Sequence, residues 1–392
     1  MKHKPFYLCR KNALQPNSQP NSKSNYQYDI NDNGSNISTI LNAYGIKPSL
    51  RTDIKIGIIE LGGGYLESDL EACMAINNFP DWKASEHVFP YFIDGYPTDV
   101  VANFNNDLNS SEEVELDIEI ISNCIPNGRI NVYFAPNDTN QQFIDAFTQA
   151  INDNCTVISC SWGQQEYYYD NNSIFTFEKV FEKAKHKGIS IFIASGDRGN
   201  TDSNLNPLLQ NNGIGFPVYY PASSPNVIAC GGTILSLKLK NGEYTKYSKE
   251  TSWIEVPLED PTNIGIGTGG ESMYFSAPTY QKKLGYKKRT VPDISGNASF
   301  IATPWLIYYN GAITQVGGTS CVAPMWAGYI GGLGCNVFLN NYLYRLTKKC
   351  FHDITMGQNY PYEATPGYDL CTGLGSPNGE ILTKYLKKIF KK

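Results

Sequence analysis

Short hydrophobic runs, rich in β-branched and aromatic residues, recur along the chain and predict buried strands. They occupy residues 54–59, 88–93, 130–135, 156–161, 189–194 and 227–230. Segments with helical spacing of hydrophobic residues separate several of them, at residues 141–151, at residues 174–186 and after Glu112. Continuous hydrophobic strands that alternate with helices are typical of a parallel sheet covered on both faces. The pattern predicts an α/β fold with a predominantly parallel central sheet.

The segment from Glu112 to Cys124 fits two periods. Its hydrophobic residues alternate with acidic ones, as in a strand, yet several of them also recur at the i, i+4, i+7 spacing of a helix. The serines at 110–111 offer N-cap side chains, which favours the helix. In a helix, Glu113 and Asp117 would lie on one face with their Cβ atoms about 5–6 Å apart.

The first 35 residues differ from the rest, because they are polar and irregular, with repeated Asn, Ser, Gln and Pro. Such a stretch cannot bury enough apolar surface to offset its ordering entropy, so residues 1–35 are expected to be a disordered tail or a loosely draped arm. Residues 36–392 are expected to form one domain. Hydrophobic residues make up 41% of the chain, which is enough for a sizeable core, and the net charge of -5 argues against a nucleic-acid partner.

The hydrophobic runs are too short for membrane targeting. None reaches the 18 or more consecutive apolar residues of a membrane span, and the apolar run near the N-terminus is too short for a signal-peptide core. The ten cysteines form no CxxC pair. Cys155, Cys160 and Cys230 lie in or beside predicted strands, so they are expected to be free thiols in the core.

A glycine-rich turn that enters a hydrophobic helical run is the strongest chemical signal in the chain. Residues 317–324 read GGTSCVAP and place Ser320 at the start of the expected helix. A serine there lies beside unpaired backbone N–H groups, so that one site offers a nucleophile and a cradle for an anion. An isolated serine in this position is more often a helix cap, but the longer string resembles the nucleophile signature of subtilisin-fold peptidases.

A histidine base for this serine is not apparent. The four histidines are His3, His87, His186 and His352, and none stands in the His-Gly-Thr context of a subtilisin base. His3 falls in the expected tail, and His186 ends a helix in a lysine-rich surface context. A Ser-His-Asp triad is therefore not expected.

Six strings in the chain resemble, in family order, the sedolisin (serine-carboxyl peptidase) family, and its kumamolisin-like branch in particular. They are IIELGGGY at 58–65, EVELD at 113–117, SCSWG at 159–163, ASGD at 194–197, the GGTS string that ends at Ser320, and DLCTGLGSP at 369–377. The resemblance covers roughly residues 37–390, so residues 36–392 are expected to be a sedolisin-like peptidase domain. The family has a subtilisin-like α/β fold, which implies a helix at Glu113.

The resemblance implies a role for four residues. Ser320 matches the nucleophile, and Glu113 matches the general base that takes its proton. Asp117 matches the carboxyl group that orients this base. Asp197 matches an aspartic acid of the oxyanion hole, where subtilisins have Asn.

Other acidic residues carry weaker implications. Glu60 and Trp162 match positions that some members of the family use to extend the proton network. Glu112, Glu115 and Glu119 match no such position and are expected to be solvated surface charges.

Two strings near the C-terminus, FHDIT at 351–355 and TPGYD at 365–369, resemble the halves of the family's calcium site. The resemblance implies one Ca²⁺ ion, held by the carboxylates of Asp353 and Asp369. The backbone carbonyls of Ile354, Thr365 and Gly367 would complete a set of oxygen ligands, which calcium prefers. Without the resemblance, two aspartates at this spacing would be turn formers.

These residues predict a serine-carboxyl endopeptidase that hydrolyses peptide bonds in protein or peptide substrates at acidic pH. A carboxylate is a weaker base than imidazole, and Asp197 can donate a hydrogen bond only when it is protonated. The protein is expected to be a monomer with access to an acidic compartment or medium, without a nucleic-acid or membrane partner.

The alternative is a catalytically silent peptidase relative that binds peptides or a protein partner. Its main support is that only the polar tail precedes the matching region, where family members usually carry a long prodomain. In the glycine-rich segment at 267–272, which lines the substrate cleft in the family, Thr268 replaces a glycine and Glu271 adds a charge. The side-chain preference of a relative therefore cannot be transferred.

Overall fold

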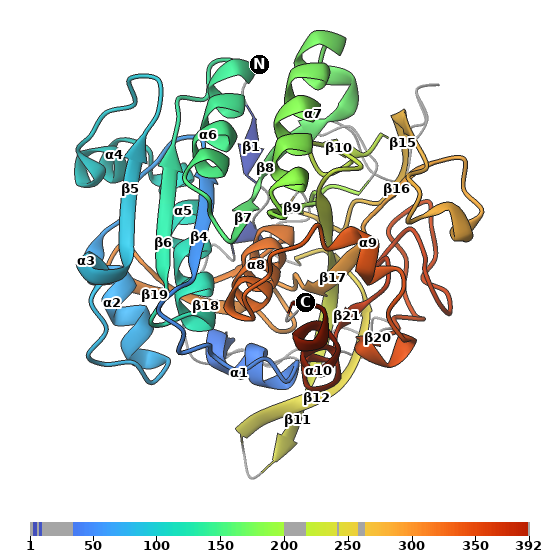
Figure 1. Cartoon of the computed structure of the whole chain (residues 1–392). Helices are drawn as coiled ribbons and strands as arrows, with labels where there is room; N and C mark the ends of the chain where they lie inside the picture. The colour runs from blue at the N-terminus through green and yellow to red at the C-terminus, as the bar shows by residue number, and fades with distance from the viewer. Residues whose placement is uncertain are drawn as a thin grey trace.

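An eight-stranded sheet forms the centre of the structure, in the order β12-β11-β9-β7-β4-β6-β5, with β17 also paired to β11 (Figure 1). Neighbouring strands are parallel, except that β11 and β12 are antiparallel. The strands span Lys55–Glu60 (β4), Val88–Phe92 (β5), Arg129–Phe134 (β6), Val157–Cys160 (β7), Ser190–Ala194 (β9), Ile228–Lys240 (β11), Glu243–Ser252 (β12) and Ile294–Asn297 (β17). Each predicted hydrophobic run overlaps one of these strands, so the predominantly parallel sheet is confirmed.

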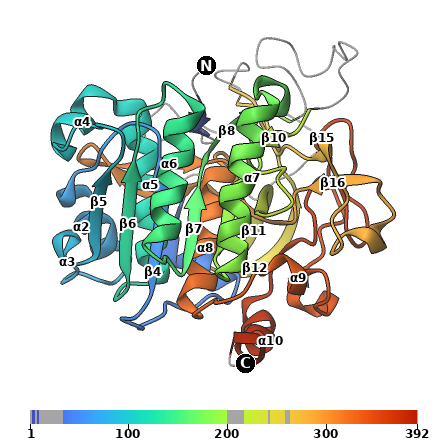
Figure 2. The same cartoon turned by 45° about the horizontal axis from the view of Figure 1, so that its top comes forward.

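Helices cover both faces of this sheet. The first face packs against α6 (Asn140–Asn152) and α7 (Asn171–His186), which stand side by side in Figure 2. The second face packs against α5 (Leu108–Cys124) and α8 (Val322–Gly332). Strand β4 shows the alternation, since Ile59 belongs to the hydrophobic core under α6 and α7, whereas Ile58 belongs to the core under α5 and α8. The predicted helices over both faces are thus confirmed.

The computed structural model describes residues 3–5, 8–9, 34–199, 217–240, 243–257 and 263–390. The further α-helices are α1 (Ile37–Ala43), α2 (Glu67–Ile76), α3 (Ala84–His87), α4 (Val100–Asn106), α9 (Asn340–Leu343) and α10 (Gly379–Phe390). Short 3-10 helices are η1 (Glu166–Tyr168), η2 (Lys282–Leu284), η3 (Thr319–Cys321) and η4 (Lys348–Cys350). No described helix combines the length and the apolar composition that a membrane span requires.

Smaller sheets surround the central one. Their strands are β1 (Lys4–Pro5), β2 (Leu8–Cys9), β3 (Ser35–Asn36), β8 (Trp162–Gln165), β10 (Tyr219–Tyr220), β13 (Ile254–Glu255), β14 (Gly265–Ile266), β15 (Gly270–Ser276), β16 (Lys288–Val291), β18 (Trp305–Tyr309), β19 (Ala312–Gly317), β20 (Phe351–His352) and β21 (Ser376–Pro377). They form the groups β1-β8-β10, β2-β19-β18-β3, β13-β14, β15-β16 and β20-β21. Two of these groups, those of β8 and β19, border the candidate active site.

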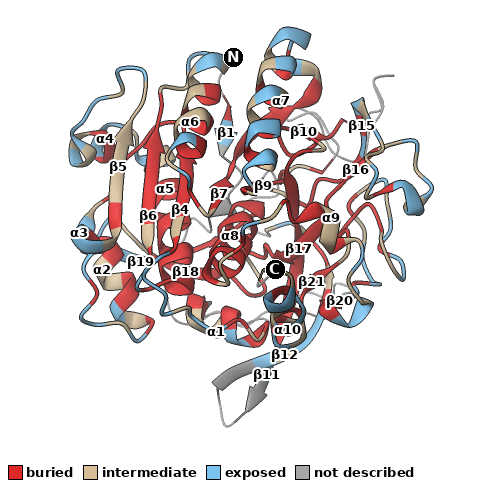
Figure 3. Cartoon of the chain, in the orientation of Figure 1, coloured by how far each residue is buried: buried red, intermediate tan, exposed pale blue. Residues whose placement is uncertain are grey.

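The segment at Glu113 is a helix, as the family resemblance implied, but its start and its surroundings differ from the prediction. Asp107 caps α5 by accepting a hydrogen bond from Ser110 N at 3.2 Å, so the predicted serine cap at 110–111 is wrong. Helix α5 is covered by α8 and η3 on one side and by α2 and β18 on the other. Figure 3 shows its middle in the buried colour.

The acidic residues of α5 that were expected to be solvated are in fact buried, so this prediction is wrong. Glu112, Glu115 and Glu119 have exposed fractions of 9%, 0% and 1%. Glu115 Oε1 accepts a hydrogen bond from Leu66 N at 2.8 Å, and the Glu119 carboxylate accepts one from Tyr308 N at 3.0 Å. The physical reason is that α5 is an inner helix, whose second face contacts protein instead of water.

Most of the predicted N-terminal tail lies outside the described residues, but its described part is ordered in strands. Lys4–Pro5 pairs with β8, and Leu8–Cys9 pairs with β19. These residues therefore differ from the disorder expected of residues 1–35, because edge strands of the domain satisfy their backbone groups. The nine described cysteines are all free and buried, as predicted for Cys155, Cys160 and Cys230.

Candidate active site

Ser320 lies in η3, between the end of β19 and the start of α8. Two glycines make this turn possible. Gly318 has a φ of 106°, and a Cβ on Gly317 would lie 2.6 Å from Ala298 O. The Ser320 side chain is fully buried, and its Oγ has no hydrogen-bond partner among the described residues. The turn thus presents an unpaired hydroxyl inside the protein.

Helix α5 brings Glu113 and Asp117 to this hydroxyl. The Ser161 hydroxyl donates to Asp117 Oδ1 at 2.9 Å and also lies 3.5 Å from Ser320 O. Both carboxylate oxygens of Glu113 are buried without a hydrogen-bond partner among the described residues. The Ser320 side chain lies close enough to lower the pKa of Glu113, against larger effects that raise it. The structure therefore brings Ser320, Glu113 and Asp117 together.

Glu60 and Trp162 extend the same cluster. Glu60 is the last residue of β4, and Trp162 is the first residue of β8. Trp162 Nε1 donates to Glu60 Oε2 at 2.9 Å, and both side chains are buried. The two residues that weakly matched the family's proton network are thus hydrogen-bonded to each other and lie beside Asp117, whose charge acts on Glu60.

Burial sets the electrostatics of this carboxyl cluster. It raises the pKa of Glu113 well above its usual range, and the negative charges of Asp117 and Glu60 raise it further. Burial likewise raises the pKa of Asp117 and of Glu60. Like charges in a desolvated site disfavour full ionisation, so the cluster keeps at least one proton at pH values where three exposed carboxyl groups would all be ionised.

Asp197 lies beyond the end of β9, next to the turn that carries Ser320. Its Oδ1 accepts hydrogen bonds from Thr319 N at 2.8 Å and from Thr319 Oγ1 at 2.6 Å. Thr319 Oγ1 in turn accepts one from Gly196 N at 3.1 Å. Asp197 Oδ2 is buried without a partner among the described residues. Burial raises the pKa of Asp197 to about 7, so Oδ2 is the atom left to carry the proton.

Unpaired buried polar atoms therefore gather at one place. They belong to Ser320, Glu113, Glu60 and Asp197. Buried polar groups are normally hydrogen-bonded, so a cluster of unpaired ones is typical of a site that interacts with a ligand or a reacting group. Chemically, the arrangement offers a nucleophile, a base of raised pKa and a protonated acid.

The glycine-rich segment packs on the loop that carries Asp197. Ile266 N donates to Asp197 O at 2.9 Å, and Thr268 N donates to Gly196 O at 2.9 Å. The Thr268 side chain, which replaces the family's glycine, is buried and donates to Gly199 O at 2.8 Å. Glu271 is exposed. Thr268 thus holds the loop that carries Asp197 through hydrogen bonds to Gly196 and Gly199.

The predicted calcium ligands lie in two adjoining loops. The exposed Asp353 carboxylate accepts the Gly367 N–H at 2.9 Å, which joins one half of the segment to the other. The buried Asp369 carboxylate accepts the N–H of Thr365 at 3.1 Å. Among the described residues, no group of three or more His, Cys, Asp or Glu side chains is arranged to hold a metal. Any metal here would need backbone oxygens as ligands.

Two residues of the site were missed by the sequence reasoning. Ser161 fixes Asp117, and Thr319 fixes Asp197. Both stand inside strings that the sequence singled out, SCSWG and GGTS, directly beside a residue that was named. The sequence signal that could have identified them is a hydroxyl side chain directly beside a candidate site residue.

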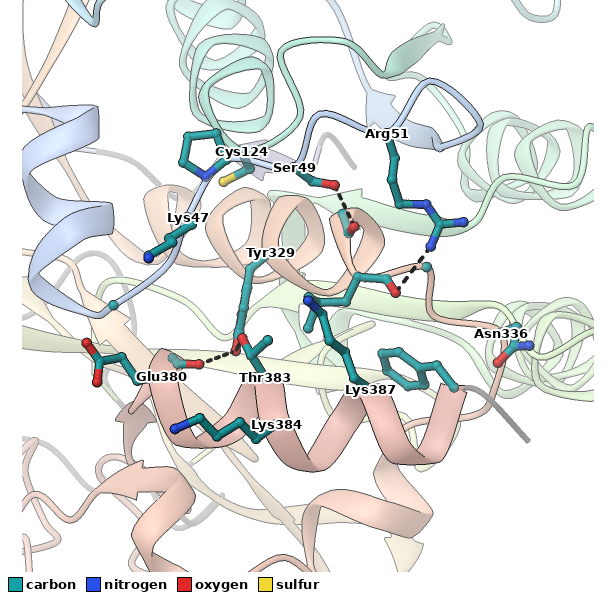
Figure 4. Close-up of a pocket in the computed structure, with 17 residues that line it drawn as sticks. Lys47, Ser49, Arg51, Cys124, Tyr329, Asn336, Glu380, Thr383, Lys384 and Lys387 are labelled. Atoms are coloured by element: carbon teal, nitrogen blue, oxygen red, sulfur yellow. Dashed lines mark hydrogen bonds between the residues drawn. The ribbon is translucent and has the colours of Figure 1, made fainter.

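A cavity of about 880 Å³ lies elsewhere, between the C-terminal helix α10 and the end of α8 (Figure 4). It is lined by α10, by the end of α8 and by the loop after α1. Ser49 Oγ donates to Gly332 O at 2.7 Å, and Tyr329 contacts Thr383 on α10. Tyr329, a residue of α8 that lines the cavity, comes nine residues after Ser320, which is about 13 Å along a helix. None of the candidate site residues lines it.

Comparisons with known proteins find related sequences. The profile of the subtilase family matches residues 99–333. The chain is 35% identical to kumamolisin of Bacillus sp. (strain MN-32), over 84% of this chain and 59% of that protein. It is 31% identical to sedolisin of Pseudomonas sp. (strain 101), over 63% of this chain and 44% of that protein. The chain thus spans about half the length of these relatives.

A solved structure agrees in fold. Pseudomonas sedolisin, a serine-carboxyl proteinase complexed with two molecules of pseudo-iodotyrostatin, aligns with a TM-score of 0.75 at 27% sequence identity. The alignment covers 91% of this chain and 99% of that chain. The predicted subtilisin-like fold is thereby confirmed.

Buried carboxyl groups should make the protein more stable in acid than at neutral pH. Burial raises the pKa of Glu119, on the face of α5 away from Ser320, well above its usual range. A raised folded-state pKa adds stability that is complete below the unfolded value, about pH 4, and is lost as the pH rises toward the folded-state pKa. We expect the melting temperature to fall between pH 4 and pH 7.

The variant Glu119→Gln tests this expectation, because its amide oxygen still accepts the Tyr308 N–H but cannot ionise. It should flatten the decline by a few degrees, since about 1 kcal/mol corresponds to roughly 2–4 °C in domains of about 200 residues. Glu86→Gln, at an exposed glutamate, is the control and should follow the wild type. Calorimetry that finds equal slopes in all three proteins would contradict the assignment.

Proposed function

Because the chain belongs to the subtilase family and, within it, to the kumamolisin-like sedolisins, we propose that it is a serine-carboxyl endopeptidase that hydrolyses protein or peptide substrates at acidic pH. The observation that carries the proposal is the convergence of the unpaired Ser320 hydroxyl, the unpaired Glu113 carboxylate and the half-paired Asp197 carboxyl group in one buried site. No histidine is needed, because the raised pKa of Glu113 makes it a stronger base than an exposed carboxylate.

In this mechanism Ser320 Oγ attacks the carbonyl carbon of the substrate, and Glu113 takes the hydroxyl proton. Asp117, held by Ser161, keeps the pKa of Glu113 raised and orients it. Glu113 then gives the proton to the leaving amine as the C–N bond breaks. A water molecule, activated by the same carboxylate, hydrolyses the acyl-enzyme and restores Ser320.

Asp197 stabilises the tetrahedral intermediate. Two hydrogen bonds from Thr319 occupy Oδ1, so a proton on Oδ2 can be donated to the oxyanion. A pKa of about 7 keeps this proton in place in acid. At higher pH the ionised carboxylate cannot donate and repels the oxyanion, so both effects oppose catalysis.

The first prediction concerns the nucleophile and the base. Ser320→Ala and Glu113→Gln should each reduce turnover of a denatured protein substrate to background between pH 3 and pH 7. The double variant should lose no more than either single one, because the two residues act as a unit. Circular dichroism should show an intact fold, and Glu86→Gln should retain full activity. Near-wild-type turnover by either variant would remove the mechanism.

The second prediction concerns the alkaline limit. Wild-type activity should fall as the pH rises through about 7, the pKa of Asp197, and the fall should reach about 10²–10³, the cost of one oxyanion donor. Asp197→Asn keeps a donor that does not titrate, so its remaining activity should extend to higher pH. The measurement is kcat/KM on one peptide from pH 3 to pH 9. An unshifted alkaline limb in the variant argues against this role.

We also propose that the loops around Asp353 and Asp369 bind one Ca²⁺ ion. Within the described residues, the carbonyl oxygens of Ile354, Thr365 and Gly367 accept no hydrogen bond, which leaves them available as ligands. By its resemblance to the family, Thr365 stands where relatives carry Gly; it has no positive φ, so its backbone does not require a glycine. When bound, the ion would cross-link the two loops through oxygen ligands of the kind that calcium prefers.

The third prediction follows from this fit. Chelation should lower the melting temperature, because a ligand bound by the native state alone stabilises it by mass action, by about 2.7 kcal/mol at a hundredfold excess over Kd. Asp353→Ala should reproduce the loss and become insensitive to chelator, whereas Asp81→Ala, at an exposed turn, should not. Identical melting with and without chelator, together with a metal content of zero, would reject the site.

A further inference from the structure

Two short strands from the N-terminus pair with the strands that border the candidate active site. In the antiparallel pair β1–β8, Lys4 lies opposite Gly163 and Pro5 opposite Trp162 (Figure 1). Trp162 directly follows Ser161, whose hydroxyl contacts both Asp117 and the Ser320 carbonyl. Strand β1 therefore lies on the edge of β8 that starts at the site.

The second pairing lies on the other border. In the antiparallel pair β2–β19, Leu8 lies opposite Gly317 and Cys9 opposite Val316. Strand β19 ends at Gly317 and leads through the turn into Ser320. Pro5 and Leu8 are joined by three peptide units, so the two pairings lie within about 11 Å of each other. The N-terminal strands, meaning His3–Pro5 and Leu8–Cys9, thus flank the nucleophile closely on both sides.

The edges that these strands occupy are the ones that an extended peptide would use. Strand β8 is paired with β10 on its other edge, and β19 is paired with β18 on its other edge. A peptide that binds beside Ser320 in an extended conformation gains backbone hydrogen bonds by adding to a free strand edge. At both borders of Ser320, that edge is already taken by the chain itself.

His3 anchors the first of these strands in a pocket of its own. Only 3% of the residue is exposed. Its backbone N–H donates to Asn137 Oδ1 at 2.9 Å, and Asn137 Nδ2 donates back to His3 O at 2.9 Å. Its ring Nδ1 lies 2.9 Å from the Tyr169 hydroxyl, and the ring packs on Phe143 with centroids 4.7 Å apart. A residue expected in a disordered tail is therefore held by three residues of the domain.

We propose that the N-terminal strands occupy the strand edges that bind the substrate. His3 holds the N-terminal strands there at neutral pH and releases them on acidification. The proposal rests on the function proposed above, since it concerns the regulation of the same site. The N-terminal strands would compete with peptide substrates for β8 and β19, so the site would open in acid, where Asp197 keeps its proton.

The surroundings of the His3 ring explain why the N-terminal strands would be released in acid. Burial is the largest cause that lowers the pKa of His3 to about 4. The titratable group that faces the ring is the neutral Tyr169 hydroxyl, while Asn140 on α6 and Gln164 on β8 face it with amides. Among the described residues, no acidic group acts on the ring. A positive charge on the docked His3 ring would therefore have no negative charge among the described residues to stabilise it.

The size of the pH effect on docking follows from the difference between the pKa of His3 in the free and in the docked state. A free histidine has a pKa of about 6.5, so docking of the neutral ring weakens as the pH falls below that value. Between pH 6.5 and pH 4 the docking constant should fall roughly 100-fold. Because the pKa of His3 is lower in the docked state than in the free state, docking is complete above the pKa of free histidine and is lost in acid.

Peptide binding tests the proposal in the full chain with Ser320→Ala, which binds peptides but does not cleave them. The Kd of a fluorescent peptide substrate is measured at pH 4, 5 and 6.5, with and without the additional change His3→Ala. The additional change should tighten binding several-fold at pH 6.5 and leave it nearly unchanged at pH 4. His186→Ala, at an exposed helix end, is the matched control and should have no effect at any pH.

The outcomes separate this proposal from the proposed function. Equal peptide affinity with His3 and with Ala at pH 6.5 overturns it, as does an effect of His3→Ala that is the same at pH 4 and at pH 6.5. Hydrolysis by the wild-type chain is measured in parallel. If hydrolysis is present and His3→Ala has no effect, the peptidase function stands and the occupant fails; if the wild type never hydrolyses peptides, the function itself fails.

Discussion

The burial of several carboxyl groups in contact with one another is the constraint on which the rest of this structure depends. Glu60, Glu113 and Asp117 are inaccessible to solvent, and among the described residues none of them forms a salt bridge. Charged carboxylates in such a place would cost several kcal/mol each, so the groups keep protons instead. The same burial makes Glu113, when it is ionised, a stronger base than an exposed carboxylate.

The fold creates this burial by bringing strand ends to one inner helix. Glu60 ends β4, Ser161 follows β7 and Asp197 follows β9, so three parallel strands deliver polar residues at their carboxyl ends, where ligands bind in open α/β sheets. Helix α5, which packs on one face of the sheet, supplies Glu113 and Asp117. The turn at Ser320 joins these groups because Gly317 and Gly318 let the backbone approach Ala298.

Buried carboxyl groups also occur outside the candidate active site. Glu115 and Glu119 place a second set of buried carboxyl groups on the opposite face of α5, and their pKa values are also raised by burial. One helix therefore carries buried carboxyl groups of raised pKa on both of its faces. His3 has the opposite sign, because burial disfavours its charged form. Acid thus strengthens the packing of α5 and weakens the hold on the N-terminal strands.

The sequence by itself determined the alternation of strands and helices, and its ordered strings named Ser320, Glu113, Asp117 and Asp197, because hydrophobic periodicity and short motifs are local properties. It could not decide which side chains have water beside them. The burial of Glu115 and Glu119, the cap of α5 at Asp107 and the pocket around His3 depend on contacts between residues far apart in the chain; His3 and Asn137 are 134 positions apart. A helix covered on both faces shows no polar stripe to mark its inner position, so only the tertiary structure decided which carboxyl groups share protons and which strand edges the chain itself occupies.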